Sequence, residues 1–205
     1  MANSKLIYQF RVELLEIEPP IWRRIQVPAE YSFWDLHVAI QDSMGWLEYH
    51  LHEFQVKKPR SRKVVEIGMP DEVTERECLA GWEVPISAYF VLPGVAATYD
   101  YDFGDSWHHQ VLLEGILLRE AAVKYPVCVA GERACPPEDC GGVSGYEDLL
   151  QILAKPRTAE YKETIVWLQG HAKNYFPYQA DRFVPGEVKF WNPAKRWQIA
   201  FGDDA

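Results

Sequence analysis

The chain has 205 residues, of which 48% are hydrophobic and 25% are charged, a composition typical of a globular protein. Its formal net charge of −9 disfavours nucleic acid as a partner, because an acidic surface repels the phosphate backbone. No segment approaches the roughly 20 apolar residues of a membrane span, and residues 1–5 show no secretory signal pattern. We therefore expect a cytoplasmic protein that contacts no membrane.

The N-terminal half predicts a pair of neighbouring strands followed by a helix. Apolar alternation predicts strands over 6–16 and 21–27, separated by Pro19-Pro20. Ser32, with Asp35 as in a capping box, predicts a helix over 32–44 that ends at Gly45. Further strands are predicted over 50–56 and 64–67, the second inside a loop-rich stretch, whereas residues 86–92 fit a strand or a helical turn equally well.

The segment Tyr99–His109 concentrates acidic, aromatic and histidine side chains. Aromatic residues and aspartates alternate up to Phe103, which predicts a strand with its rings on one face and Asp100 and Asp102 on the other. Gly104-Asp105 predicts a turn that leads into a returning strand. Together these residues predict a β-hairpin over 97–118.

The C-terminal half predicts a structured loop, a helical pair and an extended tail. Recurring proline and glycine predict the loop over 125–145. Ser144 and Thr158 are predicted to cap antiparallel helices over 145–155 and 158–169. Scattered prolines and rings predict that residues 174–205 lie extended across the rest. The expected fold class is α+β: residues 1–205 form one domain in which a mainly antiparallel sheet, with the hairpin at its centre, packs against about three helices.

Aspartate and histidine side chains around the hairpin form one candidate catalytic or metal site. Carboxylates are the ligands that hard divalent cations prefer, and Asp100, Asp102 and Asp105 cluster around one turn. His50 and His52 alternate on one strand, and His109 offers a third imidazole, which serves both as a catalytic and as a metal candidate. The structural alternative is that these groups satisfy turn and strand hydrogen bonds.

Cysteines form a second candidate metal site. Cys128, Cys135 and Cys140 lie close together in the predicted loop, and with one histidine they supply four ligands for a structural zinc ion. Their spacing differs from the paired C-x2-C of established zinc sites, and buried free thiols explain it equally well.

Aromatic side chains form a candidate binding groove for a peptide or another apolar partner. Exposed rings on a rigid sheet are good anchors for such a ligand, although the same rings also suit a domain core. The candidate binding residues are Trp22, Trp46, Tyr99, Tyr101 and Trp107, with Trp191 beside them. The sequence contains no nucleophile elbow, phosphate-binding loop, dinucleotide fingerprint or H-E-x-x-H motif, so it supports none of those enzyme classes.

Five motifs follow one another along the chain. They are Pro20-Ile21-Trp22-Arg23-Arg24, Leu36-His37 with Met44-Gly45-Trp46, His50-Leu51-His52-Glu53-Phe54, Tyr101-Asp102-Phe103-Gly104-Asp105-Ser106-Trp107, and Cys135-Pro136-Pro137-Glu138-Asp139-Cys140-Gly141-Gly142. In order and spacing the set resembles the plasmid pRiA4b Orf-three-like family. The resemblance implies a single α+β domain found in bacteria and archaea, sometimes encoded on plasmids or beside insertion elements, and it implies no activity.

Two functional interpretations follow from these observations. The favoured one is a cytoplasmic accessory or protein-interaction module, linked to mobile elements, that binds a protein or small ligand and needs no cofactor. The alternative is a hydrolase or phosphodiesterase that depends on a divalent metal ion and uses the Asp/His cluster. Convergence of at least three of the six Asp and His candidates in one pocket would favour the enzyme.

Overall fold

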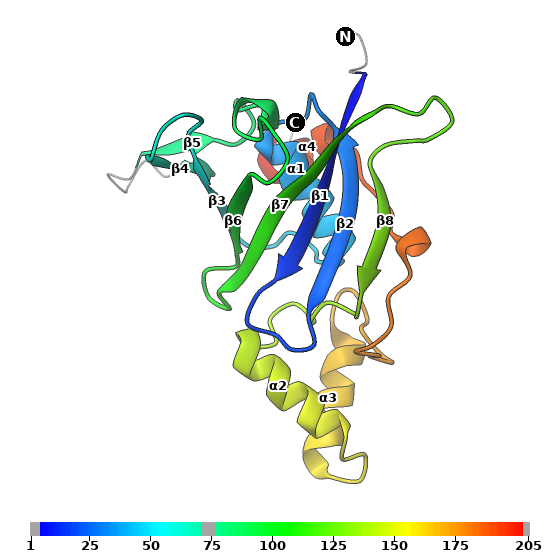
Figure 1. Cartoon of the computed structure of the whole chain (residues 1–205). Helices are drawn as coiled ribbons and strands as arrows, with labels where there is room; N and C mark the ends of the chain where they lie inside the picture. The colour runs from blue at the N-terminus through cyan, green and yellow to red at the C-terminus, as the bar shows by residue number, and fades with distance from the viewer. Residues whose placement is uncertain (1–4, 71–76, 203–205) are drawn as a thin grey trace.

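The computed structural model describes residues 5–70 and 77–202. Its frame is an eight-stranded sheet with the order β5-β4-β3-β6-β7-β1-β2-β8 (Figure 1). The pairs are antiparallel except for the parallel pair β4–β5. The strands are β1 (Leu6–Leu14), β2 (Ile21–Pro28), β3 (His52–Lys57), β4 (Val64–Gly68), β5 (Cys78–Ala80), β6 (Ala96–Tyr101), β7 (Trp107–Leu118) and β8 (Val127–Glu132).

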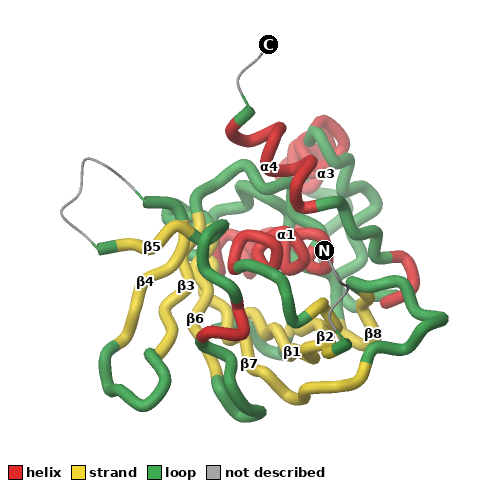
Figure 2. Tube along the Cα trace, turned by 90° about the horizontal axis from the view of Figure 1, so that it is seen from above, coloured by secondary structure: helices red, strands yellow, loops and turns green. Residues whose placement is uncertain are grey.

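Helix α1 (Phe33–Met44) covers one face of the sheet (Figure 2). It begins at the expected capping box, in which the Ser32 hydroxyl accepts a hydrogen bond from the Asp35 backbone and the Asp35 carboxylate accepts one from the Ser32 backbone. It ends at Gly45, whose φ of 91° lies in the left-handed region that glycine tolerates. Apolar side chains of the helix, including Phe33 and Leu36, pack on the buried side chains of the strands.

The other face of the sheet carries polar side chains that bond to one another. Gln26 donates to Gln9, Gln9 donates to Glu114, and Arg24 makes a two-pronged contact with the same Glu114 carboxylate. This alternation of buried and polar residues along each strand is what a sheet covered on one face requires.

A pair of helices, α2 (Gly142–Leu153) and α3 (Ala159–Gly170), lies together beyond one end of the sheet (Figure 1). Thr158 caps α3 as predicted, since its hydroxyl accepts a hydrogen bond from the backbone of Tyr161. The predicted Ser144 cap is wrong, because α2 begins after Gly141, whose φ is 92°. Two short 3-10 helices, η1 (Ile86–Ala88) and η2 (Pro185–Glu187), complete the connections.

Two elements differ from the sequence prediction. The segment predicted as a structured loop over 125–145 contains β8, which pairs with β2 and forms one edge of the sheet. Within the predicted extended tail, α4 (Pro193–Phe201) is helical, because Asn192 caps it and Pro193 occupies the first helical turn, where proline is favoured. Helix α4 packs beside α1, and its Arg196 forms an ion pair with Glu48.

The fold therefore contains four α-helices among the described residues, rather than about three. No helix in residues 5–70 and 77–202 has the length and apolar character that crossing a bilayer requires.

Candidate metal centre

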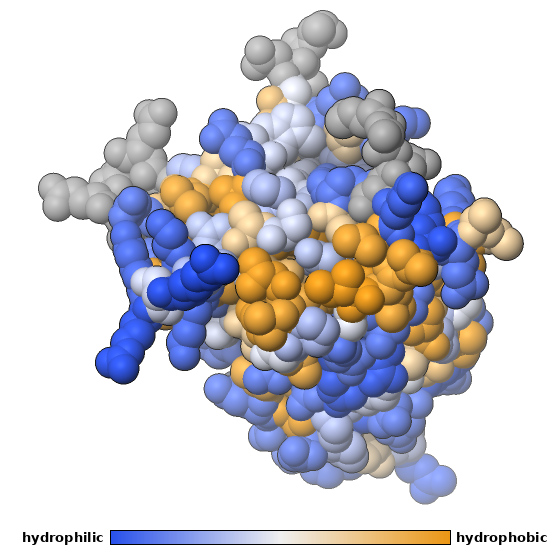
Figure 3. All heavy atoms as spheres, turned by 45° about the horizontal axis from the view of Figure 1, so that its top comes forward, coloured by the Kyte–Doolittle hydropathy of each residue, from blue (hydrophilic) through white to orange (hydrophobic). Residues whose placement is uncertain are grey.

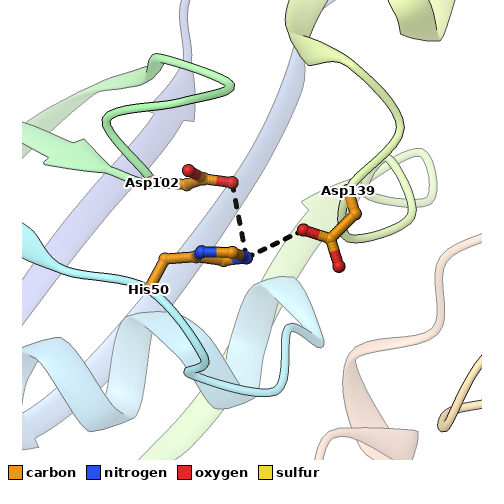
Figure 4. A group of neighbouring side chains, drawn as sticks. All are labelled: His50, Asp102 and Asp139. Carbon is orange, nitrogen blue, oxygen red and sulfur yellow. Dashed lines mark hydrogen bonds and ion pairs between the residues drawn. The ribbon is translucent and has the colours of Figure 1, made fainter.

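Three side chains from separate parts of the chain converge at the end of the sheet nearest α2 (Figures 1 and 4). The His50 Nε2 atom lies 2.9 Å from Asp139 Oδ1 and 3.5 Å from Asp102 Oδ2. The ligand atoms of the three residues all lie within 4.8 Å of one another. His50 precedes β3, Asp102 follows β6, and Asp139 lies in the loop before α2, so tertiary folding assembles the group.

The backbone conformation of Asp102 turns its carboxylate toward His50. Strand β6 ends at Tyr101, and Asp102 has a φ of 54°, in the left-handed region. Its Oδ1 atom accepts hydrogen bonds from the backbone of Gly104 at 3.0 Å and Asp105 at 3.3 Å. These contacts fix the turn and leave Oδ2 directed at the imidazole of His50.

This turn corrects the alternation predicted for Tyr99–Phe103. Tyr99 and Tyr101 are buried as expected, but the strand does not continue to Phe103, whose side chain is exposed. Asp102 is instead buried and does not share the face of Asp100. An aspartate tolerates the left-handed region better than most residues, which explains why the chain turns there.

A buried carboxylate, Glu138, lies behind the three converging side chains. Its side chain is fully buried, and Oε1 accepts hydrogen bonds from the Leu47 backbone at 2.7 Å and from the Tyr101 hydroxyl at 2.8 Å. Its other oxygen, Oε2, lies 4.0 Å from His50 Nε2. Because the Leu47 backbone and the buried Tyr101 hydroxyl both donate to Oε1, Glu138 is held in one orientation toward the cluster.

The loop that carries Glu138 and Asp139 is tied to the hairpin turn. The Gly141 backbone donates a hydrogen bond to the Asp105 carboxylate at 3.1 Å. A Cβ atom added at Gly142 would lie 2.4 Å from the Asp105 carbonyl oxygen, so glycine allows this close approach. Asp105 thus positions the loop and is not one of the three side chains that converge at His50.

The donor atoms of His50, Asp102 and Asp139 suit a divalent cation. An ion with metal–ligand bonds of about 2.1 Å separates neighbouring ligand atoms by roughly 3.0–3.5 Å, and the His50 distances to Asp139 and Asp102 fall in or near that range. Three carboxylates around one imidazole also concentrate negative charge, and a cation would neutralise it. His171 Nε2 lies 4.0 Å from Asp139 Oδ2 and borders the group on its exposed side.

The comparisons place the chain in a family. The family model described as "Plasmid pRiA4b ORF-3-like protein" matches residues 6–185, a range that contains the whole cluster. This chain belongs to that family. The uncharacterized protein y4hQ of Sinorhizobium fredii is 31% identical over 162 residues, which are 78% of this chain and 80% of that protein.

A solved structure shows the same fold. The crystal structure of the protein of unknown function MM3350 from Methanosarcina mazei Go1 is 40% identical to this pRiA4b ORF-3-like chain. It superposes with a TM-score of 0.80 and covers 91% of this chain and 99% of its own. The α+β class predicted from the sequence is therefore confirmed, and none of these relatives carries an assigned biochemical activity.

Only two of the six predicted Asp and His candidates, His50 and Asp102, meet in this group, one fewer than the three that would have favoured the enzyme. The other four lie outside it. Asp100 pairs with His108 on the open face of the sheet, at 2.7 Å. His109 is buried, its Nδ1 lies 3.1 Å from the Tyr99 carbonyl oxygen, and burial lowers its pKa to about 3. His52 is buried against His37, so it points away from His50 even though the two are close in sequence.

His52 and His37 do not form a second metal site. Their rings are parallel within 8°, with centroids 3.4 Å apart. The lone pair of each imidazole nitrogen lies in the plane of its ring. The lone pairs of two stacked rings therefore point along parallel planes and cannot both be directed at one ion.

The three cysteines do not form a group of metal ligands in the part of the chain that the structure describes. The Cys128 thiol contacts the Ala130 carbonyl oxygen, and Cys135 is buried. Burial raises the pKa of Cys135 to about 12 and also raises the pKa of Cys140, so both remain protonated thiols. Their surroundings are those of buried free cysteines.

The candidate binding aromatics are mostly core residues. Four of them are at most 4% exposed, namely Trp46, Tyr99, Tyr101 and Trp107. The Trp22 ring is half-buried on the polar face of the sheet, with the guanidinium groups of Arg11 and Arg24 at 4.2 and 5.3 Å from its centroid. These rings therefore fill the core or support ion pairs, and Trp191 alone among the six is more than half exposed.

Sequence reasoning missed Asp139 and Glu138 as members of the site. Both lie in the Cys-Pro-Pro-Glu-Asp-Cys motif, within the segment that the sequence predicts as a structured loop. Adjacent acidic residues between prolines and glycines were the available signal, but His50 and Asp139 are 89 positions apart, so only the fold shows that they meet.

Proposed function

We propose that this chain binds one divalent cation at His50, Asp102 and Asp139 and uses it to activate water for hydrolysis. The observation that carries the proposal is the convergence of one imidazole nitrogen and two carboxylates at distances suited to a single ion, with buried Glu138 behind them. Mixed nitrogen and oxygen donors favour Mn²⁺ or Zn²⁺ over Ca²⁺.

Burial of Glu138 distinguishes this group from an ordinary acidic surface. Moving a carboxylate out of water is unfavourable unless it is compensated by hydrogen bonds or an opposite charge. Hydrogen bonds from Leu47 and Tyr101 compensate Oε1, whereas Oε2 has the Tyr101 hydroxyl at 3.3 Å and otherwise faces His50. A cation beside His50 would compensate the remaining charge.

The exposure of the site suits catalysis better than a structural role. The side chain of His50 is 30% exposed and that of Asp139 is 53% exposed, so one side of the group opens to solvent. Structural zinc sites are closed by four protein ligands, whereas catalytic sites keep a position for water. A divalent cation lowers the pKa of bound water toward neutrality, and this supplies a nucleophile.

Each residue of the cluster has a separate role in this proposal. His50, Asp102 and Asp139 would hold the ion, and Glu138 would orient a water molecule beside it. Tyr101 holds Glu138 through its hydroxyl, and the Gly104 and Asp105 backbone holds Asp102. Support of this kind behind the ligands is a general feature of metal sites.

The test is a calorimetric titration of chelator-treated full-length protein with Mn²⁺ and with Zn²⁺. We expect saturable binding of one ion per chain, and binding lost in Asp139→Asn and His50→Ala. His108→Ala is the matched control, because it removes a histidine from a histidine–aspartate pair outside the cluster. Absence of binding in the unmodified protein, or equal loss in the control, would contradict the metal proposal.

Activity is tested on two activated substrates, bis(p-nitrophenyl) phosphate and p-nitrophenyl acetate. Hydrolysis that requires the added ion and disappears in Asp139→Asn supports the hydrolase, and the preferred substrate distinguishes phosphodiester from ester chemistry. Metal binding without either activity would leave a metal-binding protein and reject the hydrolytic part of the proposal.

Two sequence-based expectations remain proposals beside this one. A cytoplasmic location is supported by the free state of all four cysteines. A role as an interaction module, connected with mobile elements, is compatible with a metal centre, because the module would bind its partner through a surface away from the metal ligands.

A further inference from the structure

A groove lies along β3, β6 and part of β7, separate from the proposed metal centre. It has a volume of about 1170 Å³ and is bordered by the β3–β4 hairpin, the segment between η1 and β6, and part of β7. It shares none of its lining with His50, Asp102, Glu138 or Asp139. Small-molecule pockets span about 300–1,000 Å³, so this groove is large enough for a short peptide.

One wall of the groove is aliphatic and exposed. Val91 and Leu92 are 46% and 57% exposed, and Val64 and Val95 also line the groove. Figure 3 shows that hydrophobic residues gather in a band on the face it draws, next to projecting hydrophilic side chains. Water-exposed aliphatic side chains that gather in a concave surface are typical of binding sites.

The other wall carries positive charge. Lys57, Lys58 and Arg60 line the groove, and their side chains form no ion pair with any residue in 5–70 or 77–202. By contrast, the nearby Lys63 is paired with Glu77. Three cations thus gather at one edge of the groove in a chain of net charge −9.

We infer that this groove binds an acidic segment of a partner protein that carries apolar side chains. The aliphatic wall would accommodate the apolar side chains, and Lys57, Lys58 and Arg60 would attract the acidic ones. Charge complementarity of this kind chiefly sets the association rate and the choice of partner.

A protein segment fits the groove better than a nucleic acid does. Proteins that bind single strands stack bases on exposed aromatic rings, whereas the exposed part of this wall is valine and leucine and the Tyr89 ring that also lines the groove is half-buried. The net charge of −9 also opposes a polyanion that extends beyond the groove, whereas a short acidic peptide ends within it.

The experiment uses fluorescence anisotropy of labelled peptides with the full-length protein. The probes are a short peptide of alternating Glu and Leu, one of alternating Glu and Ser, and one of alternating Lys and Leu. We expect saturable binding of the Glu–Leu peptide that weakens as salt rises, and much weaker binding of the other two.

Variants locate the binding in the groove. Lys57→Glu with Lys58→Glu is expected to raise the Kd of the Glu–Leu peptide by about tenfold, since two exposed attractions become repulsions. Leu92→Ser is expected to weaken binding without changing its salt dependence. Lys155→Glu with Lys162→Glu is the matched control, because it changes the net charge equally at exposed lysines outside the groove.

Several outcomes would overturn the inference. They are absence of Glu–Leu binding, equal effects of the groove and control variants, and tighter binding of a single-stranded oligonucleotide than of any peptide. A concentration-dependent dimer that the Lys57 and Lys58 changes abolish would replace the partner protein with a second copy of this chain. None of these outcomes depends on the metal titration.

Discussion

The imidazole rings of His37 and His52 stack face to face in the core, with centroids 3.4 Å apart. His37 Nδ1 lies 2.8 Å from the Tyr99 hydroxyl, and its Nε2 lies 3.3 Å from the Glu48 carboxylate. Burial lowers the pKa of both histidines well below 6.5. Neutral rings can stack at this distance, whereas two charged rings would repel each other, so the core depends on their staying unprotonated.

Stability is therefore expected to fall as the solution becomes acidic. A buried histidine with a lowered pKa stays neutral in the folded protein, while the unfolded chain takes up a proton below about pH 6.5. The contribution of such a histidine to the free energy of unfolding is complete above that pH. It declines by about 1.4 kcal/mol per pH unit as the pH falls toward the pKa of the histidine in the folded protein. For His109 the decline extends from about pH 6.5 to about pH 3.

The His109→Gln variant tests this expectation. Glutamine retains a donor for the Tyr99 carbonyl oxygen but does not titrate. Urea unfolding at several pH values between 6.5 and 4 should show that the variant loses stability less steeply, by the equivalent of one proton. Identical slopes for the variant and the unmodified protein would show that His109 is protonated without difficulty in the folded state.

Asp102→Ala is expected to destabilise the protein more than Asp100→Ala. Asp102 accepts two backbone hydrogen bonds of the hairpin turn at a φ of 54°, whereas Asp100 pairs with partly exposed His108. Loss of buried acceptors costs about 1–3 kcal/mol, against about 0–1 kcal/mol for an exposed ion pair. Thermal unfolding in the absence of metal gives the comparison, and equal melting temperatures would contradict it.

Asp102→Asn separates stability from metal binding. Asparagine tolerates the left-handed region and keeps an acceptor for Gly104, so the stability of the ion-free protein should be close to normal. The loss of charge should nevertheless weaken Mn²⁺ binding. A variant that binds the ion as well as the unmodified protein would remove Asp102 from the ligand set.

Asp139→Asn is expected to have different effects with and without the ion. In chelator the change relieves repulsion between Asp139 and Asp102, whose ligand atoms lie within 4.8 Å, and weakens the ion pair of Asp139 with His50, so stability should change by no more than about 1 kcal/mol. With Mn²⁺ at a hundredfold excess over its Kd, the unmodified protein should gain about 2.7 kcal/mol, and the variant should lose that gain. Asp100→Asn serves as the control, and a destabilised apo variant without any metal effect would indicate a purely structural cluster.

Trp107→Ala is expected to cost about 3–5 kcal/mol, because Trp107 is 1% exposed and packs beside Trp46. Chemical denaturation measures the loss, and Trp191→Ala is the comparison because that ring is largely exposed. A Trp107→Ala protein that keeps its stability but loses ligand binding would support the aromatic groove and not the core.

Local signals in the sequence were sufficient where hydrogen bonds within a few residues define an element. The Ser32–Asp35 capping box, the glycine at position 45 and the Thr158 cap are all present as predicted. The pairing of β1 with β2 followed from their proximity in the chain. β8 was missed because its pairing with β2 involves residues about a hundred positions away, and proline-rich flanking sequence favoured a loop.

The candidate site depended on tertiary structure for the same reason. The sequence identified His50 and Asp102 as possible ligands from their residue types, but it also selected His52 and His109, which the core holds as neutral rings. Alternation could not show that Asp102 leaves the strand, because a left-handed backbone reverses which way a side chain points. Asp139 lies in the group because the neighbouring Glu138 anchors their loop to Leu47 and Tyr101. These contacts join residues far apart in the sequence, so packing of the whole chain decides them.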